Sequence, residues 1–334
     1  MRLIKTEDAV GHVLCHDMTQ IIKDQYKDAR FRKGHVVTEE DIPVLLSMGK
    51  EHLYVWEMTS GMVHENDAAE RLLALCGQEN MIRSGVKEGK IELKAACDGV
   101  FLVDSARLVA VNSQDEVMIA TRKGGTAVRE GDKLAGMRVI PLIIEEEKLR
   151  KAEQAAGDKP LLSLKPYVRK TTCIVATGGE VKKGLIKDTF TPVVIDKLKT
   201  YGIETLEVVY SGDGVENVRD AVLTMREKKP DMILCTGGMS VDPDDNTPGG
   251  IKAAGANIIA YGAPVLPGAM FLLGYFEDGT PVMGLPSCVM HAGATVFDLM
   301  LPKIAADVPV TRADIAALGE GGLCLGCAEC HYVS

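Results

Sequence analysis

The chain has 334 residues, of which 46% are hydrophobic and 25% charged, with 34 glycines and 14 prolines. This composition is typical of a folded globular protein and excludes a disordered or fibrous chain. The length predicts more than one domain. Lysine and arginine number 38 against 47 acids, a formal net charge of -9, so the molecule would repel a phosphate backbone and we expect no nucleic-acid partner.

The sequence also argues against a membrane protein. No stretch approaches the roughly 18 uninterrupted apolar residues that a membrane span needs, and acids follow the first residues too early for a signal peptide. We therefore expect a cytoplasmic protein with no membrane partner. Because the cytosol keeps thiols reduced, most of the nine cysteines are expected to be free thiols.

The first half of the chain is predicted to hold two parts, an N-terminal α/β segment at 1–65 and a β-rich domain at 66–150. The second part contains short apolar runs separated by glycine turns. Elements predicted in this half are a helix at 42–48, a strand at 52–56, a helix at 65–79 and a charged helix at 145–156. Glycine and prolines follow, so residues 151–170 are expected to form a linker.

Strand and helix patterns alternate from residue 171 to residue 310. Strands are predicted at 173–176, 205–210, 232–235, 257–260 and 281–285, and helices at 190–200, 215–229, 248–254 and 289–301. Such alternation indicates right-handed βαβ units. The sequence therefore predicts an α/β fold, a doubly wound and mostly parallel sheet, with a smaller N-terminal α+β, β-rich arm and a cysteine-rich tail at 311–334.

Three predicted strands end in loops rich in glycine or proline, at 176–180, 235–245 and 283–287. Ligands of parallel sheets bind at the carboxyl ends of the strands, and glycine lets backbone N–H groups approach an anion closely. Each loop alone is also consistent with ordinary turn chemistry. The candidate binding residues in these loops are Thr177, Gly178, Gly179, Thr236, Gly237, Gly238, Pro286 and Ser287.

Acidic residues gather near the same predicted edge. Asp242, Asp244 and Asp245 lie in the second loop, after its two glycines. An anionic ligand in so acidic a domain would need a divalent cation, and carboxylate oxygens are the ligands that Mg²⁺ prefers. These three acids are therefore candidate Mg²⁺ ligands, although acids in loops also cap helices and face solvent.

The motifs TGGE, DTF, SGD, TGGMSVDPDD, VLPGA and GLPSC occur in this order between residues 170 and 305. This series resembles the molybdopterin-binding domain that MoeA-type molybdotransferases, MogA/MoaB proteins and CinA-like proteins share. Residues 31–56 and the stretch GGTAVREGDKLAGM are similar to parts of MoeA-type proteins. The resemblance implies a MogA/MoaB-like sheet, a bound molybdopterin or adenylylated molybdopterin, Mg²⁺, and an elongated homodimer.

The resemblance also assigns residues. It implies that Glu180, Asp213 and Asp245 take the positions of the catalytic acids. Further binding positions that it implies are Asp188, Ser240, Pro267, Gly268 and Pro286. The family's PGK-type loop supplies lysines to anions, whereas this chain reads LPGA at the same place.

Three functions follow from these patterns. The leading hypothesis is a MoeA-like insertion of molybdate into adenylylated molybdopterin. The missing lysines favour an alternative, a non-catalytic carrier that delivers molybdenum cofactor to a molybdenum enzyme. A CinA-like nucleotide pyrophosphatase is a further alternative, so the sequence leaves open whether the chain is a transferase enzyme.

Four cysteines remain as candidate functional residues, three in the C-terminal tail and Cys288. Cys324, Cys327 and Cys330, followed by His331, have a spacing that suits Zn²⁺ or an iron–sulfur site; the alternative is a glycine-rich tail with free thiols. Cys288 follows the last proline loop and would open the final predicted helix, whose dipole would lower the pKa of its thiol. As a lone cysteine, however, Cys288 is more often a small core residue, and we favour that alternative.

Overall fold

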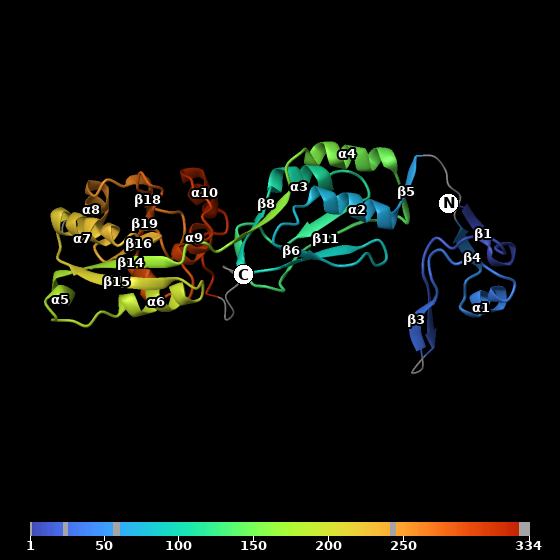
Figure 1. Cartoon of the computed structure of the whole chain (residues 1–334), viewed down its shortest axis with the longest axis horizontal. Coiled ribbons are helices and arrows are strands. Elements are labelled where there is room, and N and C mark those ends of the chain that lie inside the picture. Colours follow the sequence, from blue (N-terminus) through green and yellow to red (C-terminus); the bar gives the residue numbers. More distant parts are fainter. Residues whose placement is uncertain (1, 23–25, 56–60, 241–244, 327–334) are drawn as a thin grey trace. The chain divides into compact units, whose positions relative to one another are not determined.

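The computed structural model describes residues 2–22, 26–55, 61–240 and 245–326. The chain divides into two compact units (Figure 1). Unit 1 comprises Met1–Ala96, Leu102–Gly124 and Glu130–Ser163, and unit 2 comprises Cys97–Phe101, Gly125–Arg129 and Leu164–Ser334. No helix in the described part of the chain is both long and apolar enough to cross a membrane.

Unit 1 begins with small antiparallel pairs around a local apolar core that includes Leu14, Leu45 and Leu53. The elements of this part are β1 (Arg2–Lys5), η1 (Thr6–Asp8), β2 (Met18–Ile22), β3 (Tyr26–Phe31), α1 (Asp41–Ser47) and β4 (His52–Val55). Strand β1 pairs with β4, and β2 pairs with β3. The helix and strand predicted in this segment therefore form with nearly the expected bounds.

The remainder of unit 1 is built on a four-stranded antiparallel sheet of order β6-β7-β11-β9. Its elements are β5 (Met62–His64), α2 (Glu65–Leu75), β6 (Met81–Arg83), β7 (Ile91–Ala95), α3 (Ser105–Asn112), β9 (Val117–Thr121), β11 (Lys133–Val139), β12 (Ile143–Glu145) and α4 (Glu146–Ala156). A smaller sheet, most of whose residues belong to unit 2, contains β8 (Gly99–Val103), β10 (Thr126–Val128) and β13 (Leu162–Pro166) in the order β10-β8-β13. The β-rich prediction for this part of the chain agrees with these sheets.

The linker expected at 151–170 contains a strand that the sequence did not predict. Helix α4 ends at Ala156, as predicted, and β13 occupies 162–166. Leu162 and Leu164 are buried in that strand, so their apolar side chains hold the segment in a sheet despite the flanking prolines. The two units divide between Ser163 and Leu164.

The core of unit 2 is a six-stranded sheet of order β15-β14-β16-β19-β18-β17. Its strands are β14 (Thr171–Thr177), β15 (Glu204–Ser211), β16 (Met232–Thr236), β17 (Asn257–Tyr261), β18 (Leu272–Tyr275) and β19 (Pro281–Leu285). Strands β15, β14, β16 and β19 are parallel, and β18 is antiparallel to both of its neighbours. Every residue of β16 and β19 is buried, as expected for strands covered on both faces.

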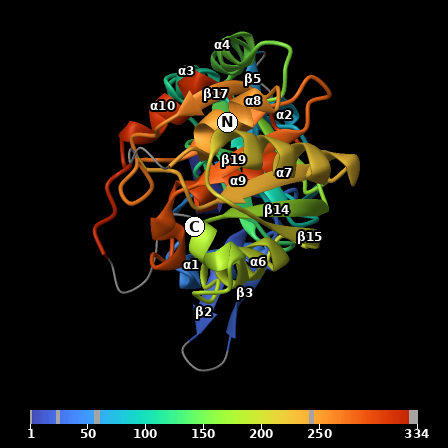
Figure 2. The same cartoon turned by 90° about the vertical axis from the view of Figure 1, so that its left-hand side faces the viewer.

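Helices cover both faces of this sheet (Figures 1 and 2). They are α5 (Gly179–Lys182), α6 (Phe190–Lys199), α7 (Val215–Glu227), α8 (Thr247–Ala253), α9 (Val296–Ala305) and α10 (Arg312–Ala316). One apolar cluster joins the sheet to α6 and α9, and a second joins it to α7 and α8. The predicted α/β class, a doubly wound and mostly parallel sheet, is confirmed.

Two predictions in unit 2 need correction. Strand β18 was not expected; it forms because its apolar residues complete a hairpin with β19. The final helix, expected at 289–301, is instead a short 3-10 turn at Ser287–Met290 followed by α9 from Val296. Thr295 and Asp298 form a capping box that sets this later start.

Candidate functional site

The three predicted loops leave the sheet at the same edge. In the parallel register Ala176 lies opposite Thr236, and Thr236 lies opposite Leu285. The loops that begin after these residues are therefore neighbours at the carboxyl ends of the strands, where α/β sheets bind ligands. We call this region of unit 2 the carboxyl edge.

Direct contacts lock the first two loops together. The Thr177 hydroxyl donates to the Thr236 carbonyl at 2.9 Å and lies 3.1 Å from the Thr247 hydroxyl. The Thr247 hydroxyl in turn donates to the Gly237 carbonyl at 2.9 Å. A Cβ on Gly238 would lie 2.7 Å from Thr247 Oγ1, so only glycine fits this close approach.

Thr247 is a site residue that the sequence did not single out. It is 1% exposed and stands at the start of α8, with a proline in the first turn of that helix. The order Asn-Thr-Pro after an acidic loop is a signal for a helix start. That signal was available, but it does not reveal that the hydroxyl reaches across to the other loop.

Asp213 joins the first loop to the end of β15. The Gly179 N–H donates to its carboxylate at 3.0 Å, and the Gly178 N–H donates to the Ser211 carbonyl at 3.2 Å. Asn217 Nδ2 also donates to the Asp213 carbonyl at 2.6 Å. The carboxylate of Asp213 is thus held beside the loop, and its assignment as a catalytic acid stays a prediction.

The second loop is closed by Asp245, whose carboxylate accepts a hydrogen bond of 2.9 Å from the Ser240 N–H. Among the described residues, no hydrogen bond reaches the other oxygen of this carboxylate. Asp242 and Asp244, the other two predicted Mg²⁺ ligands, lie outside the described residues. Within the described ranges, no group of three His, Cys, Asp or Glu residues is placed to hold a metal ion.

The loop that contains Pro267 and Gly268, which we call the first proline loop, follows β17. It also starts at this edge, because β17 runs parallel to β19. The Tyr261 hydroxyl, at the end of β17, donates to the Met239 carbonyl at 2.9 Å. Gly268 packs so closely on Val296 that a Cβ would lie 2.8 Å from its Cγ1. Pro267 and Gly268 are thereby tied to the start of α9.

Three other predicted residues occupy the same edge with fewer contacts. Glu180 is exposed in the first turn of α5. Pro286 and Ser287 begin the short 3-10 turn after β19. Hydrogen bonds within the described chain do not fix a role for these side chains, so their assignments stay predictions.

Asp188 has a structural role that the sequence left open. Its carboxylate accepts hydrogen bonds from the Phe190 N–H at 2.9 Å and the Thr191 N–H at 3.0 Å, at the start of α6. Burial alone would raise the pKa of Asp188, but these hydrogen bonds hold it below its ordinary value. The residue therefore acts as a helix cap in addition to any contact with a ligand.

Replacing Asp188 with alanine is expected to destabilise unit 2 by about 0.5–2 kcal/mol, because the N–H groups at the start of α6 lose their acceptor. Since its pKa is lowered on folding, the carboxylate stabilises the fold above the unfolded pKa, and this contribution disappears as pH falls through the folded value. Denaturant titrations of both proteins at neutral pH and at acidic pH will measure this. Equal losses at both pH values would contradict the capping role.

Of the two alternatives for Cys288, the structure favours the packed residue over the thiol with a lowered pKa. Burial raises the pKa of the Cys288 thiol, and Cys288 lies in the 3-10 turn and not at the start of α9. Burial raises the pKa of Cys235, which lies inside β16, to about 12. Burial therefore disfavours the thiolate form of both cysteines. In the cysteine-rich tail, Cys324 is exposed, and Cys327 and Cys330 lie outside the described residues.

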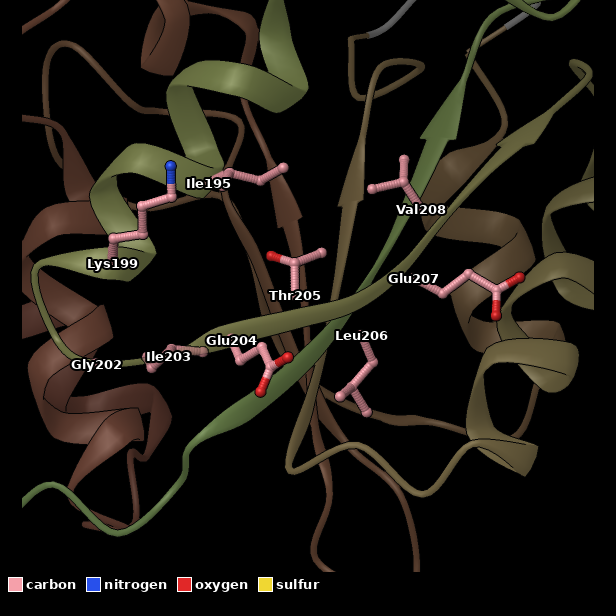
Figure 3. A pocket seen from close by; sticks show the side chains of 9 residues that line it. All are labelled: Ile195, Lys199, Gly202, Ile203, Glu204, Thr205, Leu206, Glu207 and Val208. Atoms are coloured by element: carbon pink, nitrogen blue, oxygen red, sulfur yellow. The ribbon is translucent and has the colours of Figure 1, made fainter.

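A cavity of about 650 Å³ also opens in unit 2, between α6 and the edge strand β15 (Figure 3). Ile195 and Lys199 line it from α6, and Thr205 and Val208 line it from β15. Its lining residues end at Val208, short of the carboxyl end of β15 at Ser211. This cavity contains none of the predicted site residues.

Part of unit 2 matches a known protein family. Residues 173–306 match a family described as a probable molybdopterin binding domain. Residues 3–57 match a domain of unknown function, DUF8806. The C-terminal unit thus contains a molybdopterin-binding-type domain, as the sequence predicted, whereas the MoeA-type transferase activity stays a prediction.

Individual relatives cover parts of the chain. A CinA-like protein of Mycobacterium tuberculosis (strain ATCC 25618 / H37Rv) is 32% identical over 74 residues, which are 22% of this chain and 17% of that protein. The chain therefore matches less than a fifth of that relative's length. The molybdopterin biosynthesis Mog protein of Mycobacterium ulcerans is 21% identical, covers 42% of this chain and 97% of its own, and has a TM-score of 0.35. The molybdopterin biosynthesis enzyme MoaB of Thermus thermophilus is 15% identical, with coverages of 42% and 98% and a TM-score of 0.36.

Proposed function

We propose that the carboxyl edge of unit 2 binds molybdopterin, in free or adenylylated form, and that the chain acts in molybdenum cofactor biosynthesis. The observation that supports this most is the joining of the first two loops by the Thr177 hydroxyl, which donates to the Thr236 carbonyl and lies against Thr247, within a domain that matches the molybdopterin-binding family. Locked loops keep their glycine backbone in a fixed shape, so little conformational freedom is lost when a ligand binds. The phosphate of the pterin is the anion that this edge would receive.

Positive charge near the first loop would assist the binding of the pterin phosphate. Lys182, in the last turn of α5, lies beside Gly212, with its Nζ 3.9 Å from the place that a Cβ of Gly212 would take. Lys183 follows and is exposed. We propose that these lysines supply to the phosphate the positive charge that the LPGA loop does not provide.

Asp245 is the described acid that fits a Mg²⁺ ligand. Mg²⁺ is commonly held by one or two carboxylates together with substrate phosphates, and the Ser240 N–H fixes the orientation of this carboxylate. Asp242 and Asp244 would add further oxygen ligands. The cation would neutralise charge on the phosphates, while Glu180 and Asp213 would be positioned for proton transfer.

Calorimetry will test binding. We expect heat on titration with molybdopterin or adenylylated molybdopterin, and an affinity that rises with Mg²⁺. Replacing Asp245 with asparagine should weaken Mg²⁺-dependent binding at least about tenfold, as for the loss of a charged ligand to a cation. Asp278→Asn is the matched control, because Asp278 lies in the turn between β18 and β19, at the other end of the sheet.

Binding and turnover assays together separate the three candidate functions. Molybdate insertion into adenylylated molybdopterin supports the MoeA-like reaction. Binding without turnover supports the cofactor carrier, which the missing PGK lysines favour. Hydrolysis of ADP-ribose supports the CinA-like pyrophosphatase, which the similarity to CinA-like proteins favours. No heat with either pterin would contradict the proposed function.

A further inference from the structure

A polar cavity of about 920 Å³ lies in unit 1, lined by parts of the segment 16–33, the start of α2, the loop between β6 and β7, and β11. A volume of this size suits a small molecule. Among the described residues that line the cavity, four are acidic and four are basic. Their formal charges cancel, so the cavity favours a ligand with charges of both signs over a polyanion or a polycation.

His64 ties two walls of this cavity together. Its Nε2 lies 2.9 Å from the Cys15 carbonyl, which only accepts hydrogen bonds, so Nε2 carries the proton. Its Nδ1 then accepts from Lys33 Nζ at 2.7 Å and from the Asn66 N–H at 3.1 Å. Burial lowers the pKa of His64, which agrees with a neutral ring. These bonds fix the walls before a ligand binds, so binding costs little ordering.

Glu65 brings a buried carboxyl group to the cavity. The residue is 5% exposed, and no described residue donates a hydrogen bond to its carboxylate. Gly89 leaves the space for this side chain, because a Cβ there would lie 2.5 Å from Glu65 Oε2. Burial raises the pKa of Glu65, since a buried carboxylate without donors is costly. A ligand with an ammonium group would supply the donors that this carboxylate lacks.

Arg138 places the opposite charge close to this carboxyl group. Its Nη2 lies 3.9 Å from Glu65 Oε2, which is beyond the range of a hydrogen bond. Its Nε donates to the Val139 carbonyl at 3.1 Å, and no described acceptor receives the other N–H groups of the guanidinium. A carboxylate is the acceptor that matches a guanidinium best. The cavity therefore has a site for an ammonium group and a site for a carboxylate side by side.

We propose that this cavity binds a small zwitterion of the α-amino-acid class, with its ammonium group on Glu65 and its carboxylate on Arg138. Both groups of an α-amino acid are attached to one carbon atom, which suits protein atoms only 3.9 Å apart. The ligand supplies the missing donors of the buried carboxylate and the missing acceptor of the guanidinium. The site lies in unit 1 and does not rest on the proposed function, because no residue of the carboxyl edge lines it.

Calorimetry tests the class of ligand, with glycine, glutamate and lysine as probes. These amino acids share the two charged groups and differ in the charge of the side chain. At least one of them should bind to the full chain, whereas acetate and methylamine, which carry one group each, should bind at least about tenfold more weakly. No heat with any of the three would overturn the proposal, as would equally tight binding of acetate or inorganic phosphate.

Two variants test the assigned contacts. Glu65→Gln keeps the size of the side chain and removes its charge, and Arg138→Gln removes the guanidinium. Each should weaken binding of the amino acid at least about tenfold, with denaturant titrations to check that the fold is kept. Glu70→Gln is the matched control, because Glu70 lies on the same helix, is exposed and pairs with Arg83 outside the cavity. Unchanged affinity in both test variants, or an equal loss in the control, would contradict the assignment.

Hydrogen exchange locates the bound amino acid. At about 100 times its Kd, it should slow exchange of the Asn66 and Gly89 amides about 100-fold, because it stabilises the closed walls of the cavity. The Gly179 and Ser240 amides, at the carboxyl edge, should not change. Protection at the carboxyl edge alone would move the amino acid to the candidate pterin site and overturn this proposal. Amino-acid binding without any pterin heat would instead refute only the proposed function.

Discussion

Replacing Gly237 with alanine is expected to destabilise unit 2 by about 2–5 kcal/mol, since two costs add at this position. Gly237 has a φ of +80°, and a Cβ there would lie 2.8 Å from Thr177 Oγ1 and clash with the Thr177 carbonyl. The left-handed backbone costs alanine about 1–2 kcal/mol. Overpacking against the first loop adds about 1–3 kcal/mol.

Hydrogen exchange of the backbone amides of β14 and β16 in the full chain will measure this loss of stability. Both strands lie in the core of unit 2, so their amides exchange when the unit unfolds. Gly255→Ala is the matched control. Gly255 has a φ of +92° but no neighbour within 4 Å of a Cβ, so it should show only the backbone cost. Equal losses in the two variants would mean that the first two loops are not in tight contact.

Most strands of the sheet in unit 2 could be predicted from the sequence. Strands β14, β16 and β19 are continuous apolar runs that end at glycine or proline, a pattern typical of strands buried on both faces. Strand β18 was not predicted. It has only four residues, Leu272–Tyr275, and so short an apolar run has no periodicity that would distinguish a strand from another buried segment. Its place follows from pairing with β19, which is a tertiary property.

The site was less predictable than the fold. The motif order identified the loops, but the bond between Gly179 and Asp213 joins residues 34 positions apart, and no local pattern encodes such a contact. Asp188 shows the same limit in another form, because a carboxylate at a helix start serves as a cap, as a ligand, or as both. Only its bonds to the N–H groups of α6 show that it caps the helix.

Replacing Thr247 with valine is expected to cost about 0.5–1.5 kcal/mol of stability, because the half-buried Gly237 carbonyl loses the hydrogen bond that the Thr247 hydroxyl donates to it. The shape of the side chain is nearly unchanged, so the loss reports the hydroxyl rather than packing. The hydroxyl of Thr177 loses a neighbour in the same change. We expect the second loop to loosen, and pterin binding to weaken at least about tenfold for a loss of about 1.4 kcal/mol of preorganisation.

Thr205→Val provides the matched control within the same sheet. The Thr205 hydroxyl is buried in β15 and has no hydrogen-bond partner among the described residues, so its removal should be neutral or stabilising. Denaturant unfolding and pterin calorimetry on both variants separate two explanations of the carboxyl edge. If Thr247→Val were as stable as Thr205→Val and bound pterin equally well, the hydroxyl network would not organise the loops, and their convergence would be a consequence of strand order alone.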